Sequence, residues 1–409
     1  MAEEVSSLPV TDDLLAEIFL LLPTPADLVR ASAACVSFRC LVTDRAFLRR
    51  FRSLHAAPFL GFLNYDDFHP ALPPHPSAPA ARAVSLAADF SYSFVPPHDY
   101  TWKVRDVRDG RVLLVRTLLD DDEESPSLVF TDLAVCDPLH RRCLELPLIP
   151  KDLAASVEHP PPRVEFQRWC EPFLVPPCQK DDAEETSFRV IWMAQCKTKL
   201  VAFLFSSTTG EWRAVASQGW ADLLPGTGVS TASSKSPVFF TRQYAGGCFY
   251  WVMDWREKLL TLDTTTMEFS IADLPPGCRR PPIAIVDAGE GRPGMFSVRE
   301  NVAGGTFDLY YTIRRNNKDG PQRSNNQWQM EKIIPLDSGY RYYLRSATER
   351  YLLLIRSEEE SSSLQMADVE CFSLDVKTLQ LQSVCKLKHH IFHAHIYTNF
   401  PPSLSSHTI

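Results

Sequence analysis

The sequence lacks several features that would point to particular classes of protein. No apolar segment approaches the length of a membrane span. Basic residues are not in excess either, since 42 Lys and Arg stand against 50 Asp and Glu, for a net charge of -8. That balance gives no basic stripe for a phosphate backbone, so nucleic acid is not an expected partner. Glu3 and Glu4 stand where a secretory signal needs positive charge, and we expect a soluble protein of the cytoplasm, the nucleus or both.

Metal-binding patterns are also missing. The eleven cysteines are scattered, and the closest pairs, Cys35 with Cys40 and Cys136 with Cys143, do not have the C-x2-C spacing of a zinc knuckle. We expect reduced thiols, no metal and no cofactor. Histidines crowd the stretch from 389 to 395, but the isoleucines among them favour a strand-borne surface cluster over a helix that presents ligands.

Enzyme motifs are absent or lack the context that their chemistry needs. The chain has no G-x-S-x-G, H-E-x-x-H or P-loop lysine. Gly289 to Gly294 formally matches G-x-G-x-x-G. A dinucleotide site would need a helix after it, whereas Met295 to Val298 reads as a strand. We interpret the glycines as a hairpin loop and expect no catalytic residues.

Residues 8–58 contain the clearest helical pattern of the chain. Thr11 is a suitable cap for a first helix, which Pro23 would stop. Thr24 and Pro25 then supply a cap and a first helical residue for a second helix. Shorter apolar turns follow, so the pattern predicts a compact bundle of three or four helices.

The first of these helices is apolar on nearly all sides. Leu14, Ile18 and Leu22 share one face, and Leu20 and Leu21 add apolar surface opposite it. A bundle this small cannot cover such a helix unaided. We therefore expect the rest of the chain, or a partner protein, to cover part of it.

The same block resembles an F-box. The resemblance rests on residue types in a fixed order: Leu8-Pro9, Asp13-Leu14-Leu15, Glu17-Ile18, Leu22-Pro23, Leu28-Val29-Arg30, Ala34-Cys35, Phe38-Arg39, Leu41-Val42, Asp44 and Phe47-Leu48. The family usually has a basic residue in place of Val36 and tryptophan in place of Phe38. Membership implies docking to a Skp-family adaptor and, through it, to a cullin scaffold that carries a ubiquitin-loaded enzyme.

The resemblance also implies which side chains bind the adaptor, while Phe38 is expected to serve mainly the core. The implied adaptor-binding residues are Leu8, Pro9, Leu14, Leu15, Ile18, Leu22, Pro23 and Leu28. The implied function is that of a substrate-recruiting subunit of a Skp-cullin-F-box ubiquitin ligase, which does no chemistry itself. A catalytic β-propeller and a non-degradative F-box scaffold stay open as alternatives.

The composition changes after the helical block. Proline and alanine dominate residues 59–83, which favours an extended linker, and residues 1–7 are expected to be disordered. From residue 84 to 409 short apolar runs alternate with turn residues, as strands do. Examples are Arg111 to Val115, Cys248 to Val252 and Tyr351 to Ile355.

A weak repeat organises these strands. Each copy has an apolar run, a polar turn and a bulky apolar residue, and the turns begin at Asp137, Ser206, Asp263 and Asp375. A further copy with a longer loop is expected before Trp328. The period of about 55 residues predicts about six hairpin-based blades around an axis. An irregular β-sandwich is the open alternative.

The expected fold is therefore a multidomain α+β chain, with a small all-α F-box bundle followed by an all-β, propeller-like domain. This second part resembles the kelch-like domains of plant F-box proteins, especially of grasses, through Trp102, Asp109 to Leu114 and the Cys136-Asp137-Pro138 turn. That layout implies an unidentified protein substrate held by loops on one rim. The repeat places four residues in related buried positions: Trp212, Phe269, Trp328 and Leu381.

Overall fold

The computed structural model describes most of the chain and divides it into two compact units, Met1–Pro58 and Phe59–Ile409. No helix within the described ranges is long and apolar enough to cross a bilayer. Those ranges are 11–22, 25–55, 57–64, 67–96, 101–117, 130–157, 170–176, 187–196, 198–225, 239–253, 258–275, 283–301, 306–315, 328–358 and 368–399.

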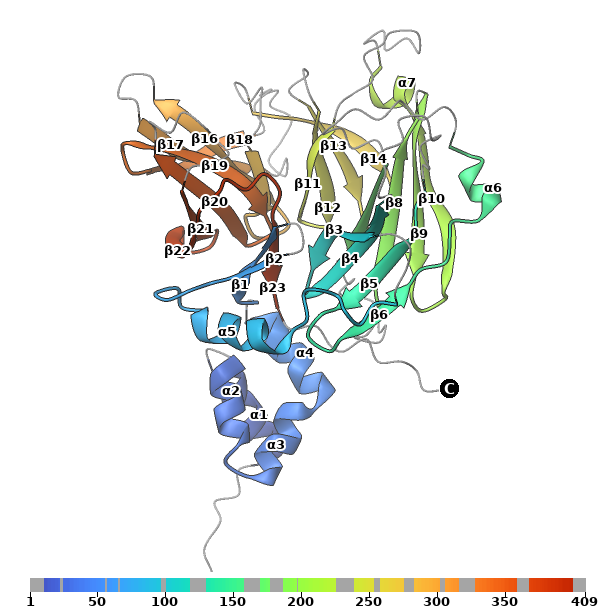
Figure 1. The fold of residues 1–409 in the computed structure, drawn as a ribbon. Helices are drawn as coiled ribbons and strands as arrows, with labels where there is room; N and C mark the ends of the chain where they lie inside the picture. Colours follow the sequence, from blue (N-terminus) through green and yellow to red (C-terminus); the bar gives the residue numbers. More distant parts are fainter. Residues whose placement is uncertain are drawn as a thin grey trace, which may run out of the picture. The chain divides into compact units, whose positions relative to one another are not determined.

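The first unit contains four helices in its described part, α1 (Asp12–Leu20), α2 (Pro25–Ser32), α3 (Val36–Thr43) and α4 (Arg45–Leu54) (Figure 1). Their ends follow the local sequence. Thr11 Oγ1 accepts a hydrogen bond from the Leu14 amide at 3.4 Å, and Asp44 Oδ1 accepts one from the Phe47 amide at 2.9 Å. The predicted helical bundle is confirmed, although Thr24 and residues 1–7 lie outside the described residues.

Aromatic and aliphatic side chains from all four helices fill the core of this unit. Phe38 is partly buried and packs edge-on against Phe19, with ring centroids 5.0 Å apart, so its predicted core role is confirmed. The fully buried members are Phe19, Leu20, Leu28, Val42, Phe47 and Phe51.

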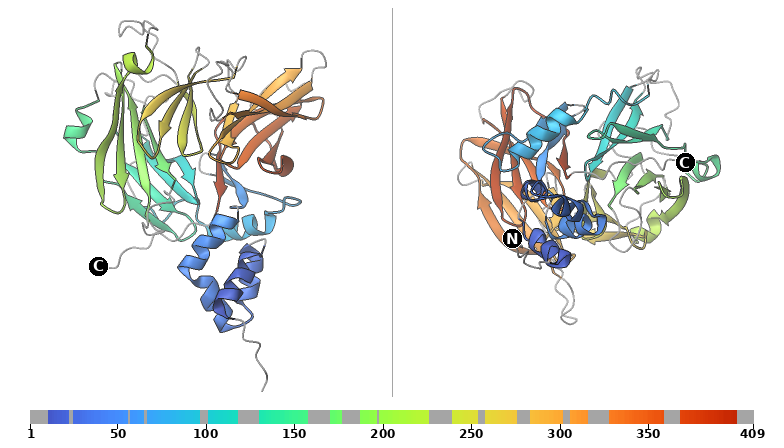
Figure 2. Two further views of the ribbon diagram at one scale, coloured as in Figure 1. Left: turned by 180° about the vertical axis from the view of Figure 1, so that it is seen from behind. Right: turned by 90° about the horizontal axis from the view of Figure 1, so that it is seen from below.

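The second unit is a six-bladed β-propeller, as predicted. Five blades are four-stranded antiparallel sheets whose strands follow chain order (Figures 1 and 2). Their strands are β3 (Thr101–Arg108), β4 (Arg111–Thr117), β5 (Leu133–Asp137) and β6 (Arg142–Glu145) in blade 1; β7 (Cys170–Val175), β8 (Arg189–Gln195), β9 (Lys199–Ser206) and β10 (Glu211–Gly219) in blade 2; β11 (Phe239–Ala245), β12 (Cys248–Met253), β13 (Lys258–Asp263) and β14 (Phe269–Asp273) in blade 3; β15 (Ile283–Asp287), β16 (Pro293–Asn301), β17 (Thr306–Arg314) and β18 (Trp328–Pro335) in blade 4; and β19 (Tyr340–Ala347), β20 (Tyr351–Glu358), β21 (Val369–Asp375) and β22 (Gln380–Leu387) in blade 5.

The sixth blade joins the two ends of the unit. It has three strands in the order β2 (Asp67–Pro70), β1 (Phe59–Asn64) and β23 (His395–Thr398). Helix α5 (Ala78–Ala87) packs against β1 and β2. The interpretation of residues 59–83 as a linker was therefore wrong. The proline-rich composition did not indicate the β1–β2 hairpin, and sequence periodicity could not detect that β1 also pairs with the distant β23.

Each of the six interfaces between neighbouring blades has its own hydrophobic cluster. Blades 2 and 3, for example, meet through Phe173 and Trp251, whereas blades 6 and 1 meet through Tyr397 and Val112. The ring is thus closed by side-chain packing at every interface. This burial on both sheet faces explains the continuous apolar runs in the middle strands, since neither face needs polar residues.

The turns between the third and fourth strands of blades 1, 2, 3 and 5 share one geometry. The Oδ1 atoms of Asp137, Asp263 and Asp375 each accept two backbone amides from the residues that follow. Four positions after the first turn residue the backbone is left-handed, with φ of 53° at Arg141, 58° at Met267 and 56° at Leu379, whereas blade 2 has Gly210 there, at 71°. The hydrogen bonds to the aspartates stabilise turns in which a residue other than glycine takes the left-handed conformation, which glycine adopts freely.

The residues that the repeat placed together do occupy related positions at the start of outer strands. Trp212, Phe269 and Trp328 are buried, as predicted, but Leu381 is 36% exposed, so its predicted burial is wrong. The two tryptophans each donate their indole N–H to a backbone carbonyl of the preceding blade, Trp212 to Pro147 at 2.7 Å and Trp328 to Asp273 at 2.9 Å. They therefore join blades as well as fill the core.

Two further sequence interpretations have clear outcomes. The Gly289 to Gly294 segment lies in the antiparallel hairpin between β15 and β16, which confirms that these glycines belong to a hairpin loop.

The histidine cluster is not strand-borne, because only His395 lies in β23. His390 is buried before that strand, against Tyr343 and Arg345, so the prediction of a surface cluster was wrong for this residue.

Candidate functional site

Helix α1 exposes an apolar stripe, which we name the α1 stripe: Leu14, Ile18 and Leu21. These residues lie four and three positions apart, and therefore on one side of a helix. Their exposed fractions are 52%, 47% and 81%. Because the core of the unit is already filled from the other side of α1, the stripe is free for a partner of apolar character.

The predicted adaptor-binding residues divide into three groups. Leu14 and Ile18 are exposed, as binding requires. Leu15 and Leu22 are partly buried, and Leu28 is a core residue at 4% exposure. The remaining three lie outside the described residues: Leu8, Pro9 and Pro23.

The sequence reasoning misjudged how α1 is rotated. Leu20 and Leu21 were both assigned to the face opposite Leu14 and Ile18, but Leu20 is buried and Leu21 shares the exposed stripe. Adjacent helical residues differ by about 100°, so one boundary position decides between core and surface. Spacing at i, i+4 and i+7 from Leu14 could have identified the stripe, had Leu21 been taken as its third member in place of Leu22.

An ion pair at the surface connects α1 to α4. Arg50 donates from Nη2 to Oε2 of Glu17 at 2.9 Å and from Nη1 to Oε1, which gives a two-pronged contact. This hydrogen-bonded contact raises the pKa of Arg50. The pair orients the helix that carries the α1 stripe, although both side chains are about half exposed.

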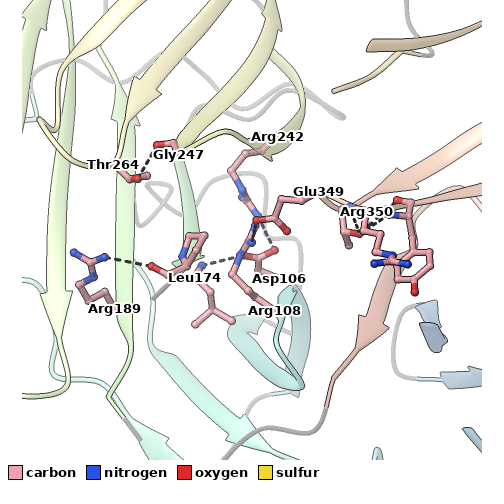
Figure 3. Close-up of polar contacts among 12 residues, drawn as sticks. Asp106, Arg108, Leu174, Arg189, Arg242, Gly247, Thr264, Glu349 and Arg350 are labelled. Carbon is pink, nitrogen blue, oxygen red and sulfur yellow. Dashed lines mark hydrogen bonds and ion pairs between the residues drawn. The ribbon is translucent and has the colours of Figure 1, made fainter. Parts of the chain in front are cut away.

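The propeller has a different kind of polar centre, formed by the inner strands of blades 1, 2 and 3. Arg242 of β11 donates from Nη2 to Asp106 Oδ1 at 2.6 Å (Figure 3). Its Nη1 donates to Glu171 Oε1. Asp106 Oδ2 also accepts the Leu174 amide at 2.8 Å, and Glu171 Oε2 accepts the Trp251 indole N–H at 3.1 Å. One arginine thus connects three consecutive blades.

A second ion pair links blades that are not sequence neighbours. Arg108 of β3 lies 3.2 Å from Glu349, which follows β19, and its guanidinium lies 4.8 Å from the Tyr244 ring centroid (Figure 3). Burial raises the pKa of Glu349, and the nearby Arg108 charge opposes that shift. Because these charges satisfy one another, the arrangement fits a structural role in closing the ring.

Replacing Arg242 with methionine is expected to lower the free energy of unfolding by about 3–5 kcal/mol, because Asp106 and Glu171 would remain buried without their cation. Urea denaturation measures the change. Lys258→Met, which removes the exposed pair with Asp273, serves as control and should cost less than about 1 kcal/mol. Equal effects of the two substitutions would show that the buried network adds no stability.

No protein-family model matches the chain, and no curated protein matches it. Solved propellers are similar to it at low identity. The propeller domain of the Trilobed protease from Pyrococcus furiosus shares 9% identity with a TM-score of 0.33, over 69% of this chain and 71% of that one. Oligogalacturonate lyase in complex with manganese shares 12% with a TM-score of 0.37, over 72% and 68%. TolB from Acinetobacter baumannii shares 10% with a TM-score of 0.31, over 81% and 75%.

Residues with metal-binding chemistry do not gather in the described part of the chain, where no group of three or more His, Cys, Asp or Glu side chains is placed to hold an ion. The strand order and the inter-blade clusters define the propeller. The α1 stripe is an exposed apolar surface of the helical unit.

Proposed function

We propose that this protein is an F-box subunit that recruits substrates to a Skp-cullin-F-box ubiquitin ligase. The observation that carries the proposal is the α1 stripe, an exposed apolar face on the helix where the F-box resemblance places the adaptor contacts. Leu14 and Ile18 belong to both. An apolar face of this kind on a folded unit is typical of a protein-binding surface.

The propeller supports the second half of the proposal. In this role it binds a protein substrate through loops at one rim, while the helical unit binds the adaptor. The two polar centres on its inner strands are internally paired. They therefore favour a rigid recognition scaffold over a reactive site, and the protein is proposed to be non-catalytic.

Reconstitution with purified adaptor, cullin and ubiquitin-loading enzyme tests the function. The full chain is expected to form an equimolar complex with the adaptor in size-exclusion chromatography. Proteins captured from cells with the proteasome blocked should then become ubiquitinated in the reconstituted reaction. Adaptor binding without ubiquitination would favour a non-degradative scaffold, and failure to bind any Skp-family adaptor would reject the F-box assignment and favour the catalytic propeller.

A further inference from the structure

Arg345 lies on an inner strand of the propeller but, unlike Arg242 and Arg108, is not paired with a carboxylate in the described ranges. Arg242 and Arg108 each contact a carboxylate. Arg345 lies on β19 and is partly buried. Burial lowers the pKa of its guanidinium, and the neighbouring Tyr343 opposes that shift only in part.

The immediate surroundings of Arg345 are aromatic. Its Nη2 lies 3.2 Å from Nε2 of His390, and its guanidinium carbon lies 4.8 Å and 5.9 Å from the ring centroids of Tyr343 and Phe392. Burial and the Arg345 charge lower the pKa of His390, so the imidazole is neutral near pH 7 and can accept that hydrogen bond. The aromatic faces attract the cation but accept few of its N–H donors.

The Arg345 guanidinium therefore still has N–H donors for a ligand. A guanidinium has five N–H donors, and the buried Nε of Arg345 has no hydrogen-bond partner among the described residues. Phe392 stands next to this cation with 48% of its surface exposed. A ligand that brings an acceptor to the guanidinium would thus also contact an exposed aromatic ring.

The backbone at Arg345 deviates from regular pairing. The β19–β20 register shifts between Leu344 and Ser346, which leaves Arg345 without a cross-strand partner residue. Bulges of this kind redirect a side chain and often lie next to binding sites. His390 and Phe392 come from the segment between β22 and β23, so strand β19 and the connection between blades 5 and 6 together form the cluster.

We propose that Arg345, His390, Tyr343 and Phe392 form a binding site for an oxyanion, a carboxylate or a phosphate, that is attached to a flat apolar group. Arg345 donates charge-assisted hydrogen bonds to the oxyanion. Phe392 packs against the apolar group, while Tyr343 and His390 hold the guanidinium in place. This site does not depend on adaptor binding by the helical unit.

Saturation-transfer NMR with the full chain tests the site, using phenyl phosphate and benzoate as probes and benzyl alcohol as the uncharged control. At least one of the two anions is expected to bind, and the preferred anion identifies the oxyanion class. Inorganic phosphate should compete with phenyl phosphate. Arg345→Gln should weaken the anions roughly 10- to 100-fold. Arg345→Lys, which keeps the charge but loses the fork of donors, should have a smaller effect.

Two further variants distinguish binding at this site from nonspecific attraction between the anion and exposed positive charges. Arg341→Gln removes an exposed arginine of the same strand and should leave affinity unchanged. Phe392→Ala, at an exposed position that does not threaten folding, should weaken phenyl phosphate roughly two- to tenfold. Anion binding that is equal in wild type, Arg345→Gln and Phe392→Ala would overturn the proposal, as would stronger binding of benzyl alcohol than of either anion.

Discussion

Replacing Leu14 and Ile18 together with alanine is expected to weaken binding to a Skp-family adaptor roughly 10- to 150-fold. Complete burial of one aliphatic side chain is worth roughly 1.5–3 kcal/mol. Each of these two residues already has about half of its surface covered within the unit, with 52% and 47% exposed. Binding can therefore gain about 0.75–1.5 kcal/mol from each, and the sum of about 1.5–3 kcal/mol corresponds to roughly 10- to 150-fold.

Calorimetric titration of the full chain with purified adaptor gives the affinity, and circular dichroism reports whether the helices persist. Leu54→Ala, at an exposed position on α4, is the matched control and should bind normally. Leu28→Ala should instead unfold the helical unit, because truncating a buried leucine costs about 2–5 kcal/mol. Unchanged affinity in the double variant would refute the α1 stripe as the adaptor site.

Deleting residues 394–409 is expected to abolish the single cooperative unfolding transition of the whole propeller. The deletion removes β23 and leaves β1 with one unpaired edge. Ile396 would be lost from the cluster between blades 5 and 6, and Tyr397 from the cluster between blades 6 and 1. Both neighbouring blades would then expose apolar faces, so the damage spreads beyond the deleted strand.

Differential scanning calorimetry distinguishes global loss from local fraying. Tyr397→Phe is the control, because it keeps the ring and removes only the hydrogen bond to the Gly110 carbonyl at 2.9 Å. That variant should unfold in one transition with a loss of about 1 kcal/mol. A truncated protein that melts sharply at the original temperature would show that the blades are independent.

Local signals in the sequence predicted the elements that depend on local chemistry. Thr11 marks the start of α1 because a hydroxyl can satisfy an early helix amide. Asp263 and Asp375 mark the turns that repeat from blade to blade. Five of the six blades followed from that repeat, since each turn links the third and fourth strands of one sheet, whereas the three-stranded blade of β2, β1 and β23 lies outside it.

Features that depend on distant partners escaped prediction. The β1 strand pairs with β2 on one side and with β23 on the other, and nothing near Phe59 indicates the second partner. Leu381 has the spacing of Trp212 but lies on a more exposed part of its blade. The burial of His390 depends on Tyr343 of β19, which is distant in the sequence. In the helical unit, only the three-dimensional core decides that Leu20 points inward.

The closure between β1 and β23 also has a consequence for synthesis of the chain. Phe59 pairs with Thr398, which is 339 positions later (398 minus 59). On the ribosome, the helical unit can fold early because its contacts are local, and blades 1 to 5 can form in order as antiparallel sheets. The edge of β1 stays open until residues 395–398 have been synthesised, and such an edge is a template for aggregation. We therefore expect the nascent chain to need chaperone protection until β23 emerges and docks.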